Sequence, residues 1–458
     1  MISRPLLLVP GMVLLTSAAA TAVDAPGPAI LGAGGGATEI TPGKLQGGGR
    51  QVYIQGLIDL DALQQGNYTD GNSDLSDHRS EGWYRAELGT RIAIDSRVEV
   101  QVTVAGQGVM GNGRATENGQ IYNNPSSTTN APSNGQSGNA VIDDAFVKLK
   151  DFLGYRELAI DAGRQPVAWN MRRDHGAFLY DSRANYQTVT SWDGLRAAYN
   201  LDTINFTPYL FRMPDDSQLY GITVDWEPAK SGDDRLFFTG SANLERRVLL
   251  RDGSKGDSLQ TYYVGADADF TDFELFGEFA MQAGDQNDST KFEGYAFSGG
   301  VDWHLDQFVL GAQYDHITGD DNASDGKNRA FINNWEAVSD TSIVESEKYG
   351  ELSRLMQGNL IGLKGKLEVA LDAKKRIRVK SVYAYYKTDK APIGGTGSRK
   401  FGQELDLNIA WDFTKDSTIT LLGGIFKPDG AYKTVSPANP TASDDFIYLM
   451  GANLLVKF

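Results

Sequence analysis

The chain ends in the sequence FIYLMGANLLVKF, at residues 446–458, and this stretch decides the fold. Every second residue, from Phe446 through Tyr448 and Met450 to the terminal Phe458, is apolar or amphipathic. A period of two is typical of a β-strand with one apolar face, here a face suited to lipid. In a soluble sheet this strand would leave an aggregation-prone edge, whereas closure into a barrel removes the edge. The stretch therefore predicts the closing strand of a membrane barrel.

The composition is compatible with a barrel and excludes several other classes. The chain has 458 residues, enough for two or three soluble domains or one large barrel. After the N-terminus, no run approaches the roughly 18 uninterrupted apolar residues that a spanning helix needs, whereas a barrel strand needs only about ten alternating ones. There is no cysteine, which excludes disulfides, thiol catalysis and cysteine-based metal sites. The net charge of −16 disfavours nucleic acid as a partner.

The N-terminus has the pattern of a signal peptide. Arg4 supplies a positive charge, residues 6–15 are mostly apolar, and Ala20-Thr21-Ala22 is a small-residue cleavage site, with 23–25 as a second one. We therefore predict a signal peptide at 1–22. Residues 23–49 are rich in Gly, Ala and Pro, and we expect a flexible periplasmic lead-in there.

From residue 51 to the end, short alternating segments follow one another. Val98, Val100, Val102 and Val104, for example, alternate with polar residues. Such segments with one aliphatic and one polar face predict about eighteen strands. We expect them near 52–60, 84–94, 98–104, 141–150, 157–164, 191–199, 204–211, 218–226, 235–245, 259–270, 273–283, 293–303, 307–317, 359–368, 376–387, 403–413, 417–427 and 445–458.

Connection lengths alternate with strand parity. Long polar segments follow odd-numbered strands, as at 108–139 and 318–358, with 212–217 as a short exception. Tight turns follow even-numbered strands, as at 95–97 and 414–416. This sorting predicts an all-β, transmembrane antiparallel β-barrel over 50–458, with short periplasmic turns and long extracellular loops. Aromatic residues beside the short turns predict a periplasmic girdle: Trp226, Phe270, Phe273, Trp303, Phe308, Trp411 and Phe413.

Several segments, in this order, resemble the alginate export family of outer-membrane barrels. They are GRQ at 163–165, SWDGLR at 191–196, LYG at 219–221, YDHITGDD at 314–321 and GQELDL at 402–407. The resemblance implies eighteen strands and a location in the outer membrane of a Gram-negative bacterium. It also implies passive passage of solutes, with export of an anionic, alginate-like polysaccharide or diffusion of small anions as the specific forms. Outer-membrane lipid and, through the C-terminal strand, the barrel-assembly machinery are the expected partners.

Charged residues on the inward parity are the candidate solute-binding residues. Lys364, Lys366, Arg378 and Lys380 lie on two adjacent predicted strands with no inward acid between them, and we call them the basic strip. Charged groups on a pore wall set its selectivity, so the strip predicts a preference for anions. Further inward cations that could join it are Arg85, Arg91 and Arg196.

Inward acids outnumber inward bases in the predicted strands. Because an alginate pore is expected to be strongly cationic, a general or small-substrate porin remains an alternative. The inward acids are Glu87, Glu99, Asp144, Asp225, Glu245, Asp267, Asp269, Glu274, Glu278, Asp302, Asp315, Glu404, Asp406 and Asp412.

We predict no enzyme activity, cofactor or metal site. No local motif for nucleophilic catalysis surrounds the four histidines His78, His175, His304 and His316. The loop Asp320–Asp325 is rich in oxygen ligands but lacks the glutamate that completes a calcium loop, so a solvated loop is favoured. The same holds for the cluster Asp70, Asp74 and Asp77. A less favoured alternative is a surface receptor, which would bind without conducting.

Overall fold

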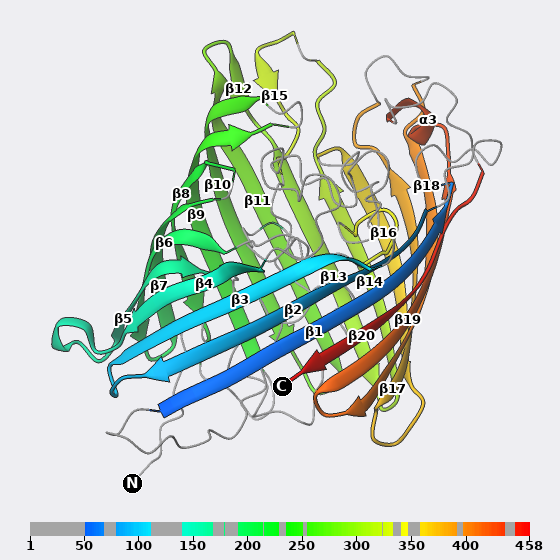
Figure 1. Cartoon of the computed structure of the whole chain (residues 1–458). Helices are drawn as coiled ribbons and strands as arrows, with labels where there is room; N and C mark the ends of the chain where they lie inside the picture. Colours follow the sequence, from blue (N-terminus) through cyan, green and yellow to red (C-terminus); the bar gives the residue numbers. More distant parts are fainter. Residues whose placement is uncertain are drawn as a thin grey trace.

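Eighteen antiparallel strands form a closed barrel (Figure 1). The first strand, β1 (Gln51–Gly66), pairs with the second and also with the last, β20 (Ile447–Lys457), so the sheet has no free edge there. The predicted fold class is thus confirmed. This computed structural model describes residues 51–67, 79–110, 140–167, 178, 191–213, 215–228, 235–250, 254–322, 324–332, 340–346, 358–391, 397–435 and 445–458. The predicted signal peptide and lead-in lie outside these residues.

Every predicted strand has a counterpart in the barrel, and each strand pairs with its neighbours in sequence. The strands between β1 and β20 are β2 (Arg79–Ala93), β3 (Val98–Met110), β4 (Ala140–Leu149), β5 (Leu158–Gln165), β6 (Trp192–Leu201), β7 (Ile204–Arg212), β8 (Gln218–Trp226), β9 (Arg235–Leu249), β10 (Lys255–Asp269), β11 (Phe273–Asn287), β13 (Tyr295–Leu305), β14 (Phe308–Ile317), β16 (Leu360–Ala370), β17 (Ile377–Lys387), β18 (Lys400–Thr414) and β19 (Ser417–Pro428).

Four short elements were not predicted. β12 (Thr290–Phe292) pairs with β11 and, in parallel, with β15 (Lys327–Asn328), and so extends the extracellular rim (Figure 1). A 3₁₀ turn, η2 (Phe152–Gly154), and a helical turn, α3 (Tyr432–Val435), lie in connections. Elements of two to four residues are too short to show a hydrophobic period. Among the described residues, no helix is long and apolar enough to cross a bilayer.

The rule of connection lengths has two further exceptions. β9 and β10 run further than predicted, and only residues 250–254 join them at the extracellular side. At the same side, residues 288–294, which include β12, join β11 to β13. The other short turns and long connections lie on opposite ends of the barrel, as predicted. This arrangement assigns the end with the long connections to the outside of the cell.

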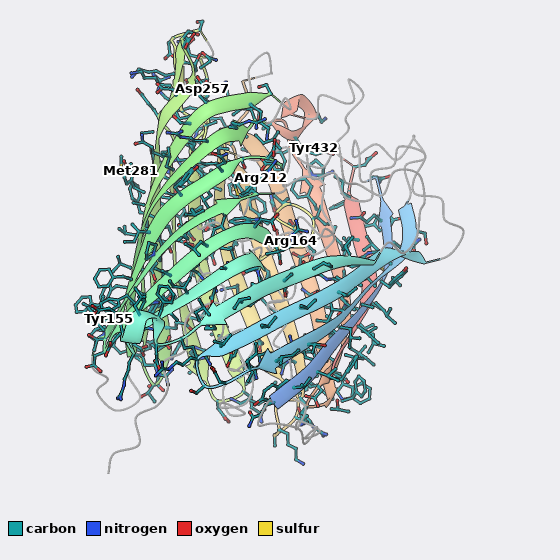
Figure 2. The ribbon with its side chains drawn as sticks, turned by 60° about the vertical axis from the view of Figure 1, so that its left-hand side comes forward. Tyr155, Arg164, Arg212, Asp257, Met281 and Tyr432 are labelled. Carbon is teal, nitrogen blue, oxygen red and sulfur yellow. The ribbon has the colours of Figure 1, made fainter. Side chains whose placement is uncertain are left out.

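The two faces of each strand reverse the pattern of a soluble protein. On β18, Leu405 and Leu407 are each 50% exposed on the outer face, whereas Glu404 and Asp406 are buried on the inner face. Met281 on β11 likewise projects from the outer face (Figure 2). Apolar side chains outside and charged side chains inside are what a barrel in lipid requires.

Aromatic side chains ring the end of the barrel that carries the short turns. Neighbouring rings touch in pairs, with centroid distances of 5.8 Å for Phe270–Phe273 and 5.9 Å for Trp411–Phe413. All seven residues of the predicted girdle are exposed on the outer face. Amphipathic rings at this height anchor a barrel at the membrane–water interface.

Two motifs of the sequence meet across β5 and β6. The register pairs Gly163 with Gly194, Arg164 with Asp193 and Gln165 with Trp192. Arg164 and Asp193 form a two-armed ion pair, with N–O distances of 2.8 and 2.9 Å. A Cβ at either glycine would overlap a backbone carbonyl oxygen of the next strand, and Gly163 has a φ of 126°. The glycines therefore let β5 approach β4 closely and let β6 approach β7 closely.

The chain terminus closes the barrel. The backbone amide of Gly56 on β1 donates a hydrogen bond to the carbonyl oxygen of Phe458 at 2.6 Å. The amide of Phe458 donates in return to the carbonyl oxygen of Gly56 at 3.0 Å. The Phe458 ring covers Gly56 where a Cβ would otherwise stand. The terminal strand thus closes the barrel, as its alternating pattern predicts.

Candidate functional site

The structure places the basic strip on the inner face of two neighbouring strands. Lys364 and Lys366 belong to β16, and Arg378 and Lys380 belong to β17. Their side chains alternate with outward apolar residues and are mostly buried; Lys364 is only 4% exposed. The strict two-residue period of the strands therefore brings all four onto one part of the inner wall.

Lys364 is the centre of this site. Its Nζ lies 2.9 Å from Asp315 on β14, 3.1 Å from Asp340 and 2.6 Å from Glu345. Asp340 and Glu345 come from the connection between β14 and β16, which the strand pattern could not place. A buried ammonium group is stable only when such partners replace its water, and here three carboxylates do so.

The other cations of the strip also hold carboxylates. Lys366 lies 3.4 Å from Asp302, and Arg378 lies 2.7 Å from Asp412. Lys380 is 3.8 Å from Asp340. Neighbouring strands and a connection thus supply acids to the strip, because buried charges need partners. The expectation that the two strip strands themselves carry no inward acid is wrong at one position: Glu368 on β16 has the parity of Lys364 and lies opposite Lys380 in the register.

Gly311 on β14 explains how Lys366 reaches Asp302. The register places Gly311 between them, opposite Asp302 on β13 and Lys366 on β16. A Cβ at Gly311 would overlap the Asp302 carboxylate and stand 2.8 Å from the Lys366 Cε. The missing side chain leaves the space in which the two charges pair across a strand.

The remaining predicted cations lie elsewhere on the wall. Arg85 and Arg91 lie on β2, which is separated from β17 by four strands of the barrel: β18, β19, β20 and β1. Arg85 pairs with Asp143 at 3.2 Å, and Arg91 stacks over the Tyr53 ring at 4.4 Å. Arg196 on β6 holds Asp161 at 2.7 Å. The structure thus does not bring these three arginines to the basic strip.

Residues 340–346, which we call the inward segment, pack inside the barrel against β16–β18. All seven are buried. The Glu404 carboxylate accepts the amides of Ile343 at 2.6 Å and Val344 at 3.0 Å, and Asp406 accepts the amide of Ser342 at 3.1 Å. Backbone amides thus bind two carboxylates of the wall, which holds the segment in place.

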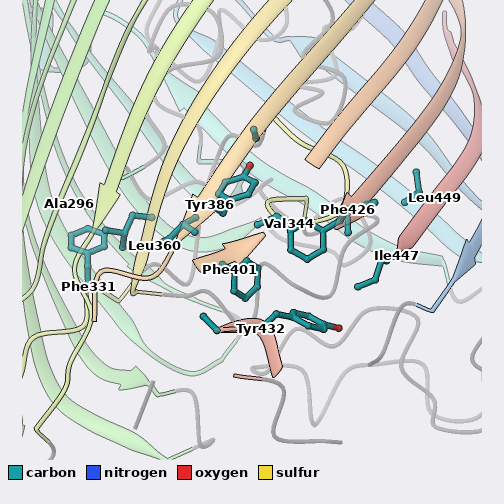
Figure 3. Packing of buried hydrophobic residues seen from close by; sticks show 14 of the residues in the cluster. Ala296, Phe331, Val344, Leu360, Tyr386, Phe401, Phe426, Tyr432, Ile447 and Leu449 are labelled. Atoms are coloured by element: carbon teal, nitrogen blue, oxygen red, sulfur yellow. The ribbon is translucent and has the colours of Figure 1, made fainter. Parts of the chain in front are cut away.

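Apolar contacts hold the same segment. Val344 lies in the buried cluster that also contains Tyr386 and Phe426 (Figure 3). The hydroxyls of Thr341 and Tyr386 are 2.9 Å apart. The pair Ile343-Val344, flanked by acids in a polar connection, was the one sequence signal that could have revealed the segment.

The pKa values of the two acids of the inward segment, Asp340 and Glu345, are shifted in opposite directions. Burial opposes the charged form of Asp340, but the ammonium groups of Lys364, Lys366 and Lys380 outweigh it and hold the pKa of Asp340 well below its ordinary value. Burial raises the pKa of Glu345, and the nearby Asp315 and Asp340 add to this shift. Asp340 therefore releases its proton at a lower pH than Glu345 does.

A second part of the wall is acidic. The strands β8–β11 carry five buried inward acids, each at most 9% exposed: Asp225, Glu245, Asp267, Glu274 and Glu278. The inner wall therefore has an acidic arc on β8–β11 and a mixed arc on β14–β18, where the basic strip lies.

In the oxygen-rich extracellular loop that begins at Asp320, two carboxylates pair with an arginine. Arg329 lies 2.7 Å from Asp325 and 3.8 Å from Asp320. The hydrogen bond from Arg329 lowers the pKa of Asp325. Among the described residues, no group of three or more His, Asp or Glu side chains has a metal-binding arrangement. The second acidic cluster, at 70–77, lies outside the described residues.

Two of the four histidines lie in the described part of the chain, and each faces a carboxylate. His304 is 3.9 Å from Glu274, and His316 is 3.1 Å from Asp389 at the extracellular rim. His78 and His175 lie outside the described residues.

Comparison with known proteins agrees with this architecture. The family model described as alginate export matches residues 77–443. No curated protein sequence matches the chain.

Solved structures of outer-membrane proteins share the fold at low sequence identity. Acinetobacter baumannii OccAB4 is 12% identical, with a TM-score of 0.58 over 89% of this chain and 98% of that one. Pseudomonas aeruginosa OccK8 (OprE) is 11% identical, with a TM-score of 0.56 over 89% and 97%. Pseudomonas aeruginosa OccK11 (OpdR) is 10% identical, with a TM-score of 0.55 over 88% and 96%.

Proposed function

The chain belongs to the alginate export family and is an outer-membrane channel for solutes, and on this basis we propose that it passes small solutes that carry carboxylates. The basic strip on β16 and β17 would recognise them. The observation that carries the proposal is the Lys364 ammonium, which holds three carboxylates within 3.1 Å. A site that binds the chain's own carboxylates has the charge and geometry to bind those of a solute.

The inward segment favours small solutes over a long polysaccharide. It fills space beside β16–β18 and is held there by Glu404, Asp406 and Tyr386. A solute that passes it moves along the part of the wall that carries the basic strip, whose buried cations act on it through their charge. Binding there has to be strong enough for entry and weak enough for release, and exchange between solute and protein carboxylates meets both needs.

Two alternatives rest on specific observations. The family match favours export of an alginate-like polymer. The acidic arc on β8–β11 favours a general porin, because it offsets the positive charge of the basic strip. Charged groups beside a constriction dominate selectivity, so the strip next to the inward segment outweighs the more distant arc in our proposal.

The remaining assignments complete the proposal. Residues 1–22 direct export, 23–49 form a periplasmic lead-in, and the terminal strand with Phe458 engages the barrel-assembly machinery. The protein acts as a channel and not as an enzyme, without cofactor or metal. Arg85, Arg91 and Arg196 line other parts of the path and contribute less to recognition than the basic strip.

The ion preference of the purified protein tests the role of the strip. In a planar bilayer under a KCl gradient, we expect a reversal potential that indicates preference for chloride. Replacing Lys366 and Lys380 together with Gln should lower the preference about threefold, since each charge acts on a nearby ion with about 1–4 kcal/mol before screening. The matched control is Lys374→Gln with Lys375→Gln, in the exposed periplasmic turn that joins the same two strands. Clear cation preference of the unmodified protein would overturn the proposal.

A further inference from the structure

Three lysines gather on the outer surface at the extracellular rim. Lys387 ends β17, Lys400 begins β18, and Lys427 lies near the end of β19. The register places Lys387 opposite Lys400 and Lys427 opposite Gln403, three residues along from Lys400. We call these three residues the rim lysines.

The rim lysines stand directly above the lipid-facing surface. Further along the same strands, towards the membrane, outward apolar side chains are about half exposed at Tyr383, Leu405 and Ile425. Tyr385 and Gln403 lie between these residues and the lysines of β17 and β18. The Lys427 ammonium lies 4.8 Å from the centre of the Phe446 ring, which is itself 53% exposed. Aromatic rings and lysine stems at such a boundary mark the level of the lipid head groups.

The positive charges of Lys387 and Lys400 lie opposite each other, and an external anion would stabilise this pair. Like charges directly opposite one another destabilise a sheet, and Lys387 faces Lys400 in this way. Within the described part of the chain, neither of these two ammonium groups has a carboxylate within 4.0 Å. At the same rim on β5–β7, by contrast, Arg164 pairs with Asp193, and Arg212 pairs with Asp216. The chain thus neutralises outward cations there and leaves Lys387 and Lys400 to another partner.

We propose that the rim lysines bind phosphate groups of the glycolipid in the outer leaflet. The rim faces the outside of the cell, where the outer membrane is built from glycolipids with phosphorylated head groups. Ammonium groups attract such phosphates, and the apolar surface below the lysines receives the acyl chains. The protein therefore has a fixed lipid neighbour on the β17–β19 side of the barrel.

The test uses the full barrel in phosphatidylcholine nanodiscs that contain bisphosphorylated lipid A. Native mass spectrometry counts the lipid A molecules retained by the protein across a titration. The triple variant Lys387→Gln, Lys400→Gln and Lys427→Gln is expected to weaken retention about tenfold. The charge-preserving triple variant with Arg at the same positions should retain lipid A, which separates loss of charge from loss of fold.

Two controls make the result decisive. Lys374→Gln, Lys375→Gln and Lys415→Gln remove the same charge from the periplasmic turns of the same strands, and retention should not change. Dephosphorylated lipid A should be retained poorly, and added inorganic phosphate should compete only weakly, because it lacks acyl chains. Equal loss in both Gln triple variants, or equal retention of dephosphorylated lipid A, would overturn the proposal.

Discussion

Replacement of Gly163 with alanine is expected to prevent stable assembly of the barrel. The new Cβ would overlap the carbonyl oxygen of Ala145 on β4 and lie 2.9 Å from the Cα of Phe146. Backbone atoms cannot move aside as a flexible side chain can. The φ of 126° at Gly163 adds strain that an L-residue rarely tolerates. Together these effects should cost about 3 kcal/mol or more of stability.

The folded fraction of Gly163→Ala can be read from heat-modifiable migration on gels and from urea unfolding in lipid vesicles. Gly277→Ala is the matched control, because Gly277 lies in strand β11 and a Cβ there would meet no heavy atom within 4 Å. The control should assemble like the unmodified protein. Normal assembly and an unchanged urea midpoint for Gly163→Ala would show that the two motifs on β5 and β6 do not need this close approach.

Replacement of Asp340 with asparagine is expected to shift the channel towards anions. Asp340 keeps its negative charge because its pKa is well below the ordinary value, so the change removes a full charge between Lys364 and Lys380. A unit charge acts on an ion a few ångströms away with a few kcal/mol, and screening in the pore should leave roughly a threefold change in permeability ratio. The reversal potential in a planar bilayer under a KCl gradient measures this ratio.

Glu345→Gln is the matched control for this prediction. Burial raises the pKa of Glu345, so on acidification its carboxyl takes up a proton before that of Asp340 does. At a pH below the raised pKa of Glu345, the substitution should therefore change the reversal potential much less. As the pH rises through that pKa, the unmodified channel should lose anion preference, and Glu345→Gln should lose less of it. Equal effects of the two substitutions across this pH range would contradict the opposite pKa shifts.

Strand positions and side-chain directions could be predicted from the sequence, because lipid outside and water inside impose a strict period of two. The alternation of Leu405 and Leu407 with Glu404 and Asp406 is one case. The pattern fails at the extracellular ends, where strands leave the lipid. β10 therefore begins at Lys255, in a polar stretch in which no apolar face marks a strand.

The charge partners of the basic strip could be predicted only in part. Asp302 and Asp315 were recognisable as inward acids, but their contacts with Lys366 and Lys364 depend on register and on the missing side chain at Gly311. The apolar pair Ile343-Val344 hinted that the inward segment is buried, but its place in the barrel could not be predicted, because that place depends on amides that bind Glu404 and Asp406 rather than on a periodic pattern. Its acids Asp340 and Glu345 are the residues of the site that sequence reasoning missed.

The central claim, that the basic strip recognises carboxylates of small solutes, is tested most directly by block of single-channel current. The series compares glucuronate, uronate oligomers of increasing length, glucose and acetate on the unmodified protein in a planar bilayer. We predict that glucuronate and short uronates interrupt the current at concentrations where glucose does not, and that block weakens for long oligomers. Equal block by glucose and glucuronate, or block that strengthens steadily with polymer length, would contradict the account.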